Sequence, residues 1–289
     1  YGRREIADAV SEQIMTLSYA TSFTVINNRE VELAERIAAK TPGDLNRIYF
    51  TTGGSTAVDS ALRLCQLASN IKGQPHRKHI LTREKAYHGS TYLSASITGK
   101  ERDKTAMDIM RDGVHFLSAP CYFYHPEFAT EAEFCDFLVD ELEQKILELG
   151  PENIMCFIAE PVMASGGVIV PPADYNYRCW QMVKKHEITY IADEVVTAFG
   201  RLGYWFASEK VFGIVPDIII FAKGVTSGYI PMGGYAVSES FLDSFSGDNA
   251  EGCLYSNGYT WGGSPVACAA ALASWDIIEK EELLDRVLE

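Results

Sequence analysis

The sequence has few of the features that would place the protein in a membrane or on a nucleic acid. No apolar run approaches the about 20 residues that a membrane-spanning helix needs. Positive charge is scarce, because 25 Lys and Arg stand against 39 Asp and Glu, and the formal net charge is -14. Phosphate backbones and anionic lipids are bound by basic surfaces. The sequence therefore predicts neither a nucleic acid nor a membrane as a partner.

Paired cysteines are also missing. None of the seven cysteines belongs to a C-x-x-C pair, so no zinc ribbon or other metal site is expected. Their odd number and irregular spacing are typical of reduced thiols that are buried as small apolar side chains. Residues 1–10 lack the apolar core of a signal peptide. These observations together predict a cytoplasmic protein.

The overall composition is that of an ordinary globular protein, with 47% apolar and 22% charged residues. Strand and helix patterns alternate over 48–222, which predicts an α/β fold with a mostly parallel sheet flanked by helices. We expect three parts. They are a helical segment over 1–43, a large α/β domain over 44–250, and a loop and helix over 251–289.

Apolar periodicity and turn residues predict the individual elements. The expected strands are 48–51, 79–82, 154–159, 188–193, 218–222 and 232–237, with a further short strand between Gly166-Gly167 and Pro171-Pro172. The expected helices are 4–17, 29–40, 55–69, 131–149, 175–186 and 264–278, with helical continuation over 281–288. Residues 100–130 are expected to be loop-rich, and 245–258 a mobile loop. In the first two helices, Ile14, Leu17 and Val31 are expected to face inward.

Two strands end on residues of opposite charge. ITYIAD ends at Asp193, and DIIIFAK ends at Lys223. Residues just past the ends of parallel strands line the crevice where ligands bind. One interpretation is a salt bridge at the edge of the sheet. The other is a pyridoxal phosphate site, in which the lysine forms a Schiff base and the aspartate keeps the pyridine nitrogen protonated.

A glycine-rich turn lies between the first expected strand of the sheet and the helix that follows. Gly53 and Gly54 turn the chain, and Ser55 is expected to cap the helix. Free amides and the helix dipole make such a turn a site for an anion such as phosphate. The same pattern also fits an ordinary turn between a strand and a helix. GGSTA resembles a nucleophile elbow but lacks the last glycine of that motif.

A second loop carries Tyr87, His88 and Gly89 after the strand expected at 79–82. An aromatic ring in this position can lie flat on a cofactor ring, or it can be a partly exposed packing residue. Ser90 is expected to cap the next helix.

These segments resemble the class III pyridoxal-phosphate aminotransferases. The shared motifs, in chain order, are Gly53-Gly54-Ser55, Tyr87-His88-Gly89, Glu160-Pro161, Asp193-Glu194-Val195 and Ala222-Lys223-Gly224. IADEVVTAFGRLG followed by PDIIIFAKG is a highly specific signature, and YTWGGSPVACAAALA also looks like this family. The resemblance covers essentially all 289 residues.

The resemblance implies a fold type I enzyme with pyridoxal 5'-phosphate as its cofactor. Lys223 would be the Schiff-base lysine and proton shuttle, and Asp193 would be the partner of the pyridine nitrogen. Val195 and Tyr87 would lie on the two faces of the ring. The remaining implied cofactor contacts are Gly53, Gly54, Ser55, His88, Glu160 and Thr260, with Thr260 reaching the phosphate of a neighbouring subunit in a homodimer.

The sequence departs from the family pattern at two positions. Thr56 replaces the usual glutamate after the glycine-serine pair, and Ser264 stands where many members have histidine. Family members are also longer at both ends, and an arginine beyond residue 289 commonly binds the substrate carboxylate. The resemblance thus implies that the small C-terminal domain is largely missing from this chain, with 251–289 leading toward it.

The implied reaction is transamination from an amine or ω-amino acid to a keto acid, with pyruvate as the expected acceptor. The stretch EVVTAFGRLGYWFASE and the later FGIVPD are similar in sequence to the ω-amino acid–pyruvate and taurine–pyruvate branch of the family. Other members of the class stay open, namely diaminopelargonate, ornithine and 4-aminobutyrate transaminases and semialdehyde aminomutases. Two further alternatives are a serine hydrolase that uses Ser55 or Ser90 with His88, and a non-catalytic protein that kept the fold.

Overall fold

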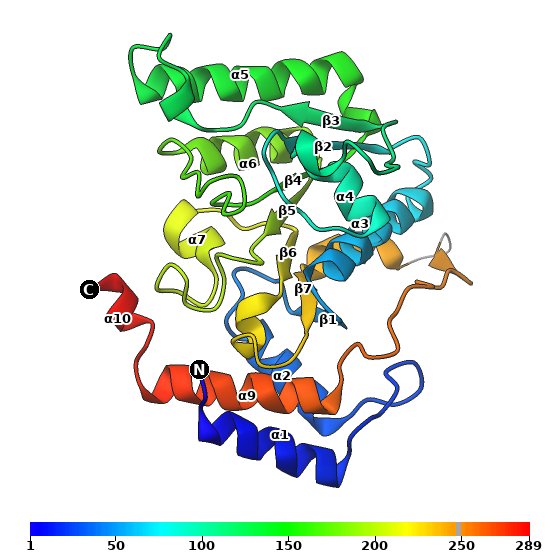
Figure 1. Cartoon of the computed structure of the whole chain (residues 1–289). Coiled ribbons are helices and arrows are strands. Elements are labelled where there is room, and N and C mark those ends of the chain that lie inside the picture. The colour runs from blue at the N-terminus through cyan, green and yellow to red at the C-terminus, as the bar shows by residue number, and fades with distance from the viewer. Residues whose placement is uncertain (247–249) are drawn as a thin grey trace.

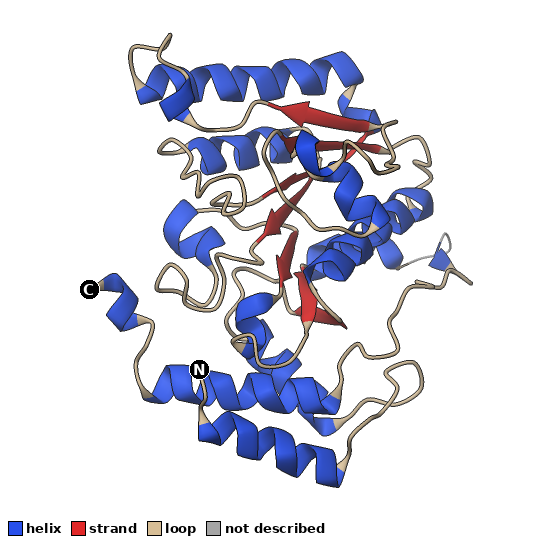
Figure 2. Cartoon of the chain, viewed as in Figure 1, coloured by secondary structure: helices blue, strands red, loops and turns tan. Residues whose placement is uncertain are grey.

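Seven strands form one sheet in the order β1-β7-β6-β5-β4-β2-β3, and helices cover it (Figures 1 and 2). The computed structural model describes residues 1–246 and 250–289. The strands are β1 (Arg47–Thr51), β2 (His79–Arg83), β3 (Val114–Leu117), β4 (Ile154–Ala159), β5 (Thr189–Asp193), β6 (Ile218–Phe221) and β7 (Gly233–Val237). The α-helices are α1 (Arg4–Thr16), α2 (Asn28–Ala38), α3 (Gly54–Ile71), α4 (Tyr92–Ile97), α5 (Glu131–Leu149), α6 (Tyr175–Lys185), α7 (Ala207–Phe212), α8 (Glu239–Leu242), α9 (Pro265–Lys280) and α10 (Asp285–Leu288). Short 3-10 turns are η1 (Glu101–Asp103), η2 (Tyr122–Tyr124), η3 (Pro151–Asn153), η4 (Lys223–Thr226) and η5 (Asp243–Phe245).

The sheet is mostly parallel, as the sequence predicts. The neighbours from β3 through β2, β4 and β5 to β6 all pair in parallel. Strand β7 is the exception, because it pairs antiparallel with both β6 and β1. The connection from β6 to β7 is short and contains only the turn η4, too little chain for the crossover that a parallel pair needs.

The central strands are buried on both faces. Every residue of β4 and β6 is buried, which explains their continuous apolar sequences. Successive side chains point to opposite faces. In β5, Ile191 packs in the cluster with α3, while Tyr190 and Ala192 pack in the cluster with α5 and α6. This two-sided packing fixes the strand ends from which the candidate site is built.

The N-terminal helix α1 packs along α9 below the sheet (Figure 1). Ile6 of α1 and Ala270 of α9 share a small apolar cluster. In the described part of the chain, no helix combines the length and apolar character that crossing a membrane requires.

One expectation about a short element was wrong, and one short strand was missed. The segment between Gly166 and Pro172 forms no strand, and only an isolated bridge joins Met163 to Ile169. Residues 100–130 are loop-rich as expected, but they also contain the edge strand β3, which the sequence did not predict. Most of β3 is only half-buried, so its four residues carry a weak apolar pattern.

The expected serine caps were also wrong. Gly53 is the N-cap of α3, and the Thr56 hydroxyl donates to its carbonyl at 2.8 Å. Ser55 already lies inside the first turn of the helix, where its Oγ accepts from the Ser90 amide at 3.0 Å. Thr91, not Ser90, is the N-cap of α4, without a side-chain cap bond.

Three side chains that were expected to face inward are largely exposed. Ile14, Leu17 and Val31 are 50%, 42% and 43% exposed. Helical continuation over 281–288 is confirmed only in part, because turns separate α9 from α10. Part of the loop expected at 245–258 falls on 247–249, which lie outside the described residues.

Candidate active site

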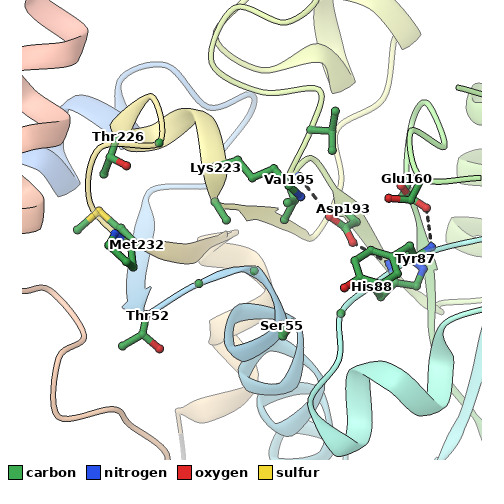
Figure 3. A pocket seen from close by; sticks show the side chains of 18 of the residues that line it. Thr52, Ser55, Tyr87, His88, Glu160, Asp193, Val195, Lys223, Thr226 and Met232 are labelled. Atoms are coloured by element: carbon green, nitrogen blue, oxygen red, sulfur yellow. Dashed lines mark hydrogen bonds and ion pairs between the residues drawn. The ribbon is translucent and has the colours of Figure 1, made fainter. Parts of the chain in front are cut away.

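A cavity of about 410 Å³ opens where β1, β2, β4, β5 and β6 end (Figure 3). Nine residues that the sequence singled out line it, namely Gly53, Gly54, Ser55, Tyr87, His88, Glu160, Asp193, Val195 and Lys223. They come from five segments that are far apart in the sequence. The fold therefore assembles one site from motifs whose order alone could not show their proximity.

Asp193, the last residue of β5, is buried and held in place on both carboxylate oxygens. Its Oδ1 accepts from the Val195 amide at 3.2 Å, and its Oδ2 lies 2.7 Å from His88 Nδ1. The other ring nitrogen of His88 lies 3.2 Å from the Thr82 hydroxyl, which also donates to the Ile97 carbonyl. This chain of contacts fixes the direction in which the carboxylate faces the cavity.

Lys223 follows β6 and reaches the same cavity (Figure 3). Its backbone has a φ of 39°, which is strained for a residue with a side chain. Within residues 1–246 and 250–289, no ion pair joins Lys223 to Asp193, so the structure does not support the simple salt-bridge interpretation. The amine therefore remains available to a ligand in the cavity.

The N-terminus of α3 forms one wall of the cavity. Amides in the first turn of a helix have no partner within the helix, and they favour an anion. A side chain at Gly54 would lie 3.4 Å from a Val195 methyl group, so the helix end sits close beside Val195. A side chain at Gly89 would lie 2.5 Å from the hydroxyls of Ser55 and Ser94, at a φ of 137°. The packing of the two loops therefore requires glycine at 89, whereas a side chain at Gly54 would make only an ordinary contact.

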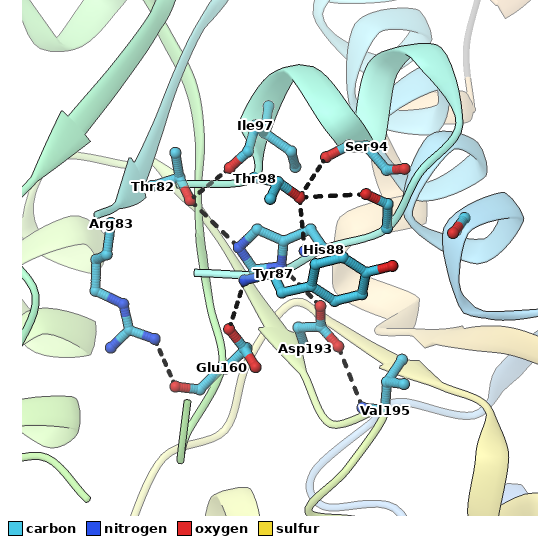
Figure 4. Close-up of polar contacts among 12 residues, drawn as sticks. Thr82, Arg83, Tyr87, His88, Ser94, Ile97, Thr98, Glu160, Asp193 and Val195 are labelled. Carbon is cyan, nitrogen blue, oxygen red and sulfur yellow. Dashed lines mark hydrogen bonds and ion pairs between the residues drawn. The ribbon is translucent and has the colours of Figure 1, made fainter. Parts of the chain in front are cut away.

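Glu160 follows β4 and is buried at the side of the cavity. Its Oε1 accepts from the Tyr87 amide at 2.9 Å, which ties the aromatic residue to the end of β4 (Figure 4). Burial raises the pKa of Glu160; His88 acts against this rise, and the nearby Asp193 adds to it.

The sequence interpretation missed the structural role of Glu194. Its fully buried carboxylate accepts from the amides of Ala207 and Ser208 at 2.7 and 2.9 Å, and from the hydroxyls of Thr197 and Ser208 at 3.1 and 2.5 Å. Burial raises the pKa of Glu194, and these hydrogen bonds act against the rise. Glu194 joins the end of β5 to the start of α7. Its position beside Asp193 in the motif was the available signal.

Other cavity residues were also missed. They are Thr52, Ser165, Val196, Thr226, Gly228, Ile230, Pro231 and Met232, together with Gly89 and Ala222, which were noted only as parts of their motifs. Several belong to η4 and the connection to β7, and carry no motif of their own. Their presence at the cavity depends on the return of the chain into an antiparallel strand.

Thr260 is the one expected site residue outside the cavity. It is exposed, and it lies on the loop that leads to α9. Its expected contact with a neighbouring subunit stays a prediction.

The hydrolase alternative conflicts with the contacts of His88. Both ring nitrogens are taken, one by Asp193 and one by Thr82. Ser55 instead contacts the Ser90 amide through its hydroxyl. No nitrogen of His88 is left to activate either serine as a nucleophile.

Comparison with known proteins agrees with the family resemblance seen in the sequence motifs. A sequence model of class III aminotransferases matches residues 1–289, so the chain belongs to the class III aminotransferase family. Enzymes of this family depend on pyridoxal phosphate. The chain is 38% identical over 288 residues to the putrescine–pyruvate aminotransferase of Pseudomonas aeruginosa, a match that covers 99% of the chain and 62% of that protein.

Two further relatives show how broad the family is. The chain is 39% identical to a mitochondrial gamma aminobutyrate transaminase of Solanum lycopersicum, covering 98% of the chain and 55% of that protein. The structure of this chain is similar to that of an (S)-enantioselective omega-transaminase from Thermomicrobium roseum, with a TM-score of 0.93 and 38% identity. The match covers 98% of this chain and 62% of that structure. The expected fold class is confirmed. The chain spans 55% to 62% of the length of these relatives.

Proposed function

We propose that the protein is a pyridoxal-phosphate-dependent aminotransferase that moves an amino group from an amine or ω-amino acid to a keto acid, with pyruvate as the preferred acceptor. The observation that carries this proposal is the convergence of Lys223, Asp193 and the N-terminus of α3 on one cavity. An amine, a carboxylate and an anion site are the three groups that this cofactor requires.

The residues present fit the cofactor. The first turn of α3 offers amides to a phosphate, and Asp193 is aimed into the cavity by Val195 and His88. Tyr87 and Val195 supply apolar surface for the ring. When bound, pyridoxal phosphate supplies an electron-withdrawing ring that stabilises a carbanion next to the amino group.

In this proposal Lys223 has two tasks. Its Nζ would be the amine that holds the cofactor through the cofactor aldehyde, and the same amine would carry a proton as a general base. Asp193 would be the residue that holds the pyridine nitrogen. His88 contacts that carboxylate directly and Thr82 contacts the other ring nitrogen of His88, so the carboxylate is held in place before a ligand binds.

The names of the relatives support the substrate class. One relative is named for putrescine and pyruvate and another for gamma aminobutyrate. In the described part of the chain no arginine lines the cavity, so a substrate carboxylate would need a partner from elsewhere. We infer that the amino donor carries a terminal amine. We also propose that the protein works in the cytoplasm.

We infer further that the working form is a homodimer. The segments 19–26 and 254–261 lie together, because the rings of Tyr19 and Trp261 are 4.8 Å apart and Gly258 packs against Phe23. Several large apolar side chains in these segments are exposed. This surface would be buried by a second copy, with Thr260 reaching the phosphate of the neighbouring site.

The test is spectroscopic and chemical. We expect the purified protein with added pyridoxal phosphate to absorb near the edge of the visible range, and borohydride to fix the cofactor on the peptide that contains Lys223. Lys223→Ala should lose this covalent label. Putrescine, gamma aminobutyrate and taurine would then be screened as donors against pyruvate and 2-oxoglutarate. A colourless protein that shows no label and no amino transfer would contradict the proposal.

A further inference from the structure

A fully buried arginine lies directly behind the cavity wall. Arg83, the last residue of β2, has no exposed surface. Its Nη2 donates to the main-chain carbonyl of Glu160 at 2.5 Å, while Nε and Nη1 have no partner among the described residues. A guanidinium is always charged, and burying it costs free energy unless nearby groups compensate. Two groups compensate this charge, namely the Glu160 carbonyl and the ring of Tyr175, whose centroid lies 5.9 Å from Cζ of Arg83.

Arg83 and Tyr87 hold Glu160 at two points (Figure 4). The guanidinium binds the main-chain carbonyl of Glu160, and the Tyr87 amide binds its carboxylate at 2.9 Å. Both donors belong to one tight turn, in which the Ala86 amide donates to the Arg83 carbonyl at 3.2 Å. The result is a closed ring of contacts from the end of β2 to the end of β4 and back. We call residues 83–87 with Glu160 the Arg83 clamp.

Three charged or titratable side chains act on the Glu160 carboxyl. The titratable groups that face this carboxylate are Asp193, His88 and Arg83. Asp193 raises the pKa of Glu160, whereas His88 and Arg83 lower it. Arg83 has the smallest effect of the three on this carboxyl, but it also holds the main chain of Glu160.

We propose that Arg83 is a positioning residue of the active site, which holds Glu160 and, through it, Tyr87 at the cavity wall and balances the charge of the Glu160 carboxylate. Arg83 itself is absent from the cavity lining, so it acts only through the clamp. The cofactor part of this inference rests on the proposed function. The charge part does not.

The test uses Arg83→Met, which removes the charge, and Arg83→Lys, which keeps the charge but not the planar fork. The matched control is Arg77→Met. Arg77 donates to the carbonyl of Ile154 at 2.6 Å, at the opposite end of the same strand β4. We expect Arg83→Met and Arg83→Lys to weaken pyridoxal phosphate binding about tenfold, and Arg77→Met to leave it unchanged.

The pH dependence of unfolding of the cofactor-free protein separates a charge role from a structural one. A buried carboxyl with a raised pKa stabilises the folded protein at low pH. This stabilisation is lost as the pH rises from the pKa in the unfolded state to the pKa in the folded state. Without Arg83 the pKa of Glu160 should rise further. The free energy of unfolding of Arg83→Met should therefore fall more steeply than that of the wild type from about pH 5 to about pH 8. This range lies above the ordinary glutamate pKa of about 4.3. Arg83→Lys should follow the wild type.

Adding Glu160→Gln to Arg83→Met should abolish the extra slope, because the amide does not titrate. An unchanged slope in this double variant would overturn the proposal, and so would wild-type cofactor binding by Arg83→Met. If Arg83→Met does not fold, Arg83→Lys decides, because it must lose cofactor affinity and keep the wild-type slope. If the wild type binds no pyridoxal phosphate, the proposed function fails, while the slope comparison still tests the charge balance.

Discussion

At the scale of single residues, the site depends on positions that tolerate only a side chain of a particular size or charge. Asp193 uses both carboxylate oxygens before any ligand binds, and Lys223 adopts a strained backbone to reach the cavity. The backbone strain at Lys223 costs stability, and such costs are typical of functional sites. The residues around them must therefore be rigid.

Gly89 offers a direct test of this rigidity. In Gly89→Ala the new Cβ would overlap Ser55 and Ser94, at a φ that disfavours side chains. We expect a loss of about 2–4 kcal/mol in the free energy of unfolding, together with weaker cofactor binding. Thermal denaturation measures the first and cofactor titration the second. Gly73→Ala is the control, because its φ is also positive but nothing lies within 4 Å. Equal losses in both variants would rule out steric overlap as the cause.

Glu30 should make the stability of the protein depend on pH. Burial raises the pKa of this half-buried carboxyl to about 7. The folded state therefore holds a proton that the unfolded state releases, and stability should decline as the pH rises from about 4.3 toward 7. We expect Glu30→Gln to flatten this decline and to stabilise the protein at pH 7 by about 1 kcal/mol, allowing for partial exposure. Unfolding by urea at several pH values measures the free energy of unfolding of both proteins. A decline identical to that of the wild type would contradict the prediction.

At the scale of elements, the ends of strands and helices do most of the positioning. Glu194 shows this, because it follows the last residue of β5 and satisfies the first amides of α7. The helix is short and would gain little from its own hydrogen bonds. One buried carboxylate thus connects the strand that carries Asp193 to the loop that precedes β6.

We expect Glu194→Gln to lower the melting temperature clearly, with a loss of about 1–3 kcal/mol, since an amide nitrogen cannot accept from Ala207 or Ser208. Calorimetry would measure the loss. Glu209→Gln on the same helix is exposed, and we expect it to change the free energy of unfolding by less than about 0.5 kcal/mol. A similar small effect for both variants would show that the Glu194 contacts contribute little.

At the scale of the whole molecule, the exposed apolar surface formed by 19–26 and 254–261 should be the main contact between two copies. Trp261, 57% exposed, lies on this surface next to Thr260. We expect Trp261→Asp to weaken dimerisation at least about tenfold, because large aromatic side chains dominate such contacts. Sedimentation velocity at several concentrations would measure this.

Leu147→Asp is the matched control for this prediction, because Leu147 is an exposed apolar residue on α5, outside these two segments. It should leave the association unchanged. If the wild type is monomeric at every concentration, both the dimer and the expected role of Thr260 are wrong.

Much of the fold followed from local sequence patterns. The apolar runs of β4 and β5, the amphipathic pattern of α5 and the glycine turn before α3 all predicted elements that the structure confirms. These features depend on neighbours within a few residues. The edge strand β3 and the caps of α3 and α4 were mispredicted, because partners distant in sequence decide them.

The sequence by itself determined the family, the strand ends at Asp193 and Lys223, and the turn at Gly53-Gly54, since each is a property of consecutive residues. Tertiary structure alone decided that Arg83 sits behind Glu160, that His88 binds Asp193, and that Glu194 anchors α7. Burial and hydrogen-bond direction depend on which segments the sheet brings together. That order, β1-β7-β6-β5-β4-β2-β3, is set by packing across the whole chain, and no local pattern contains it.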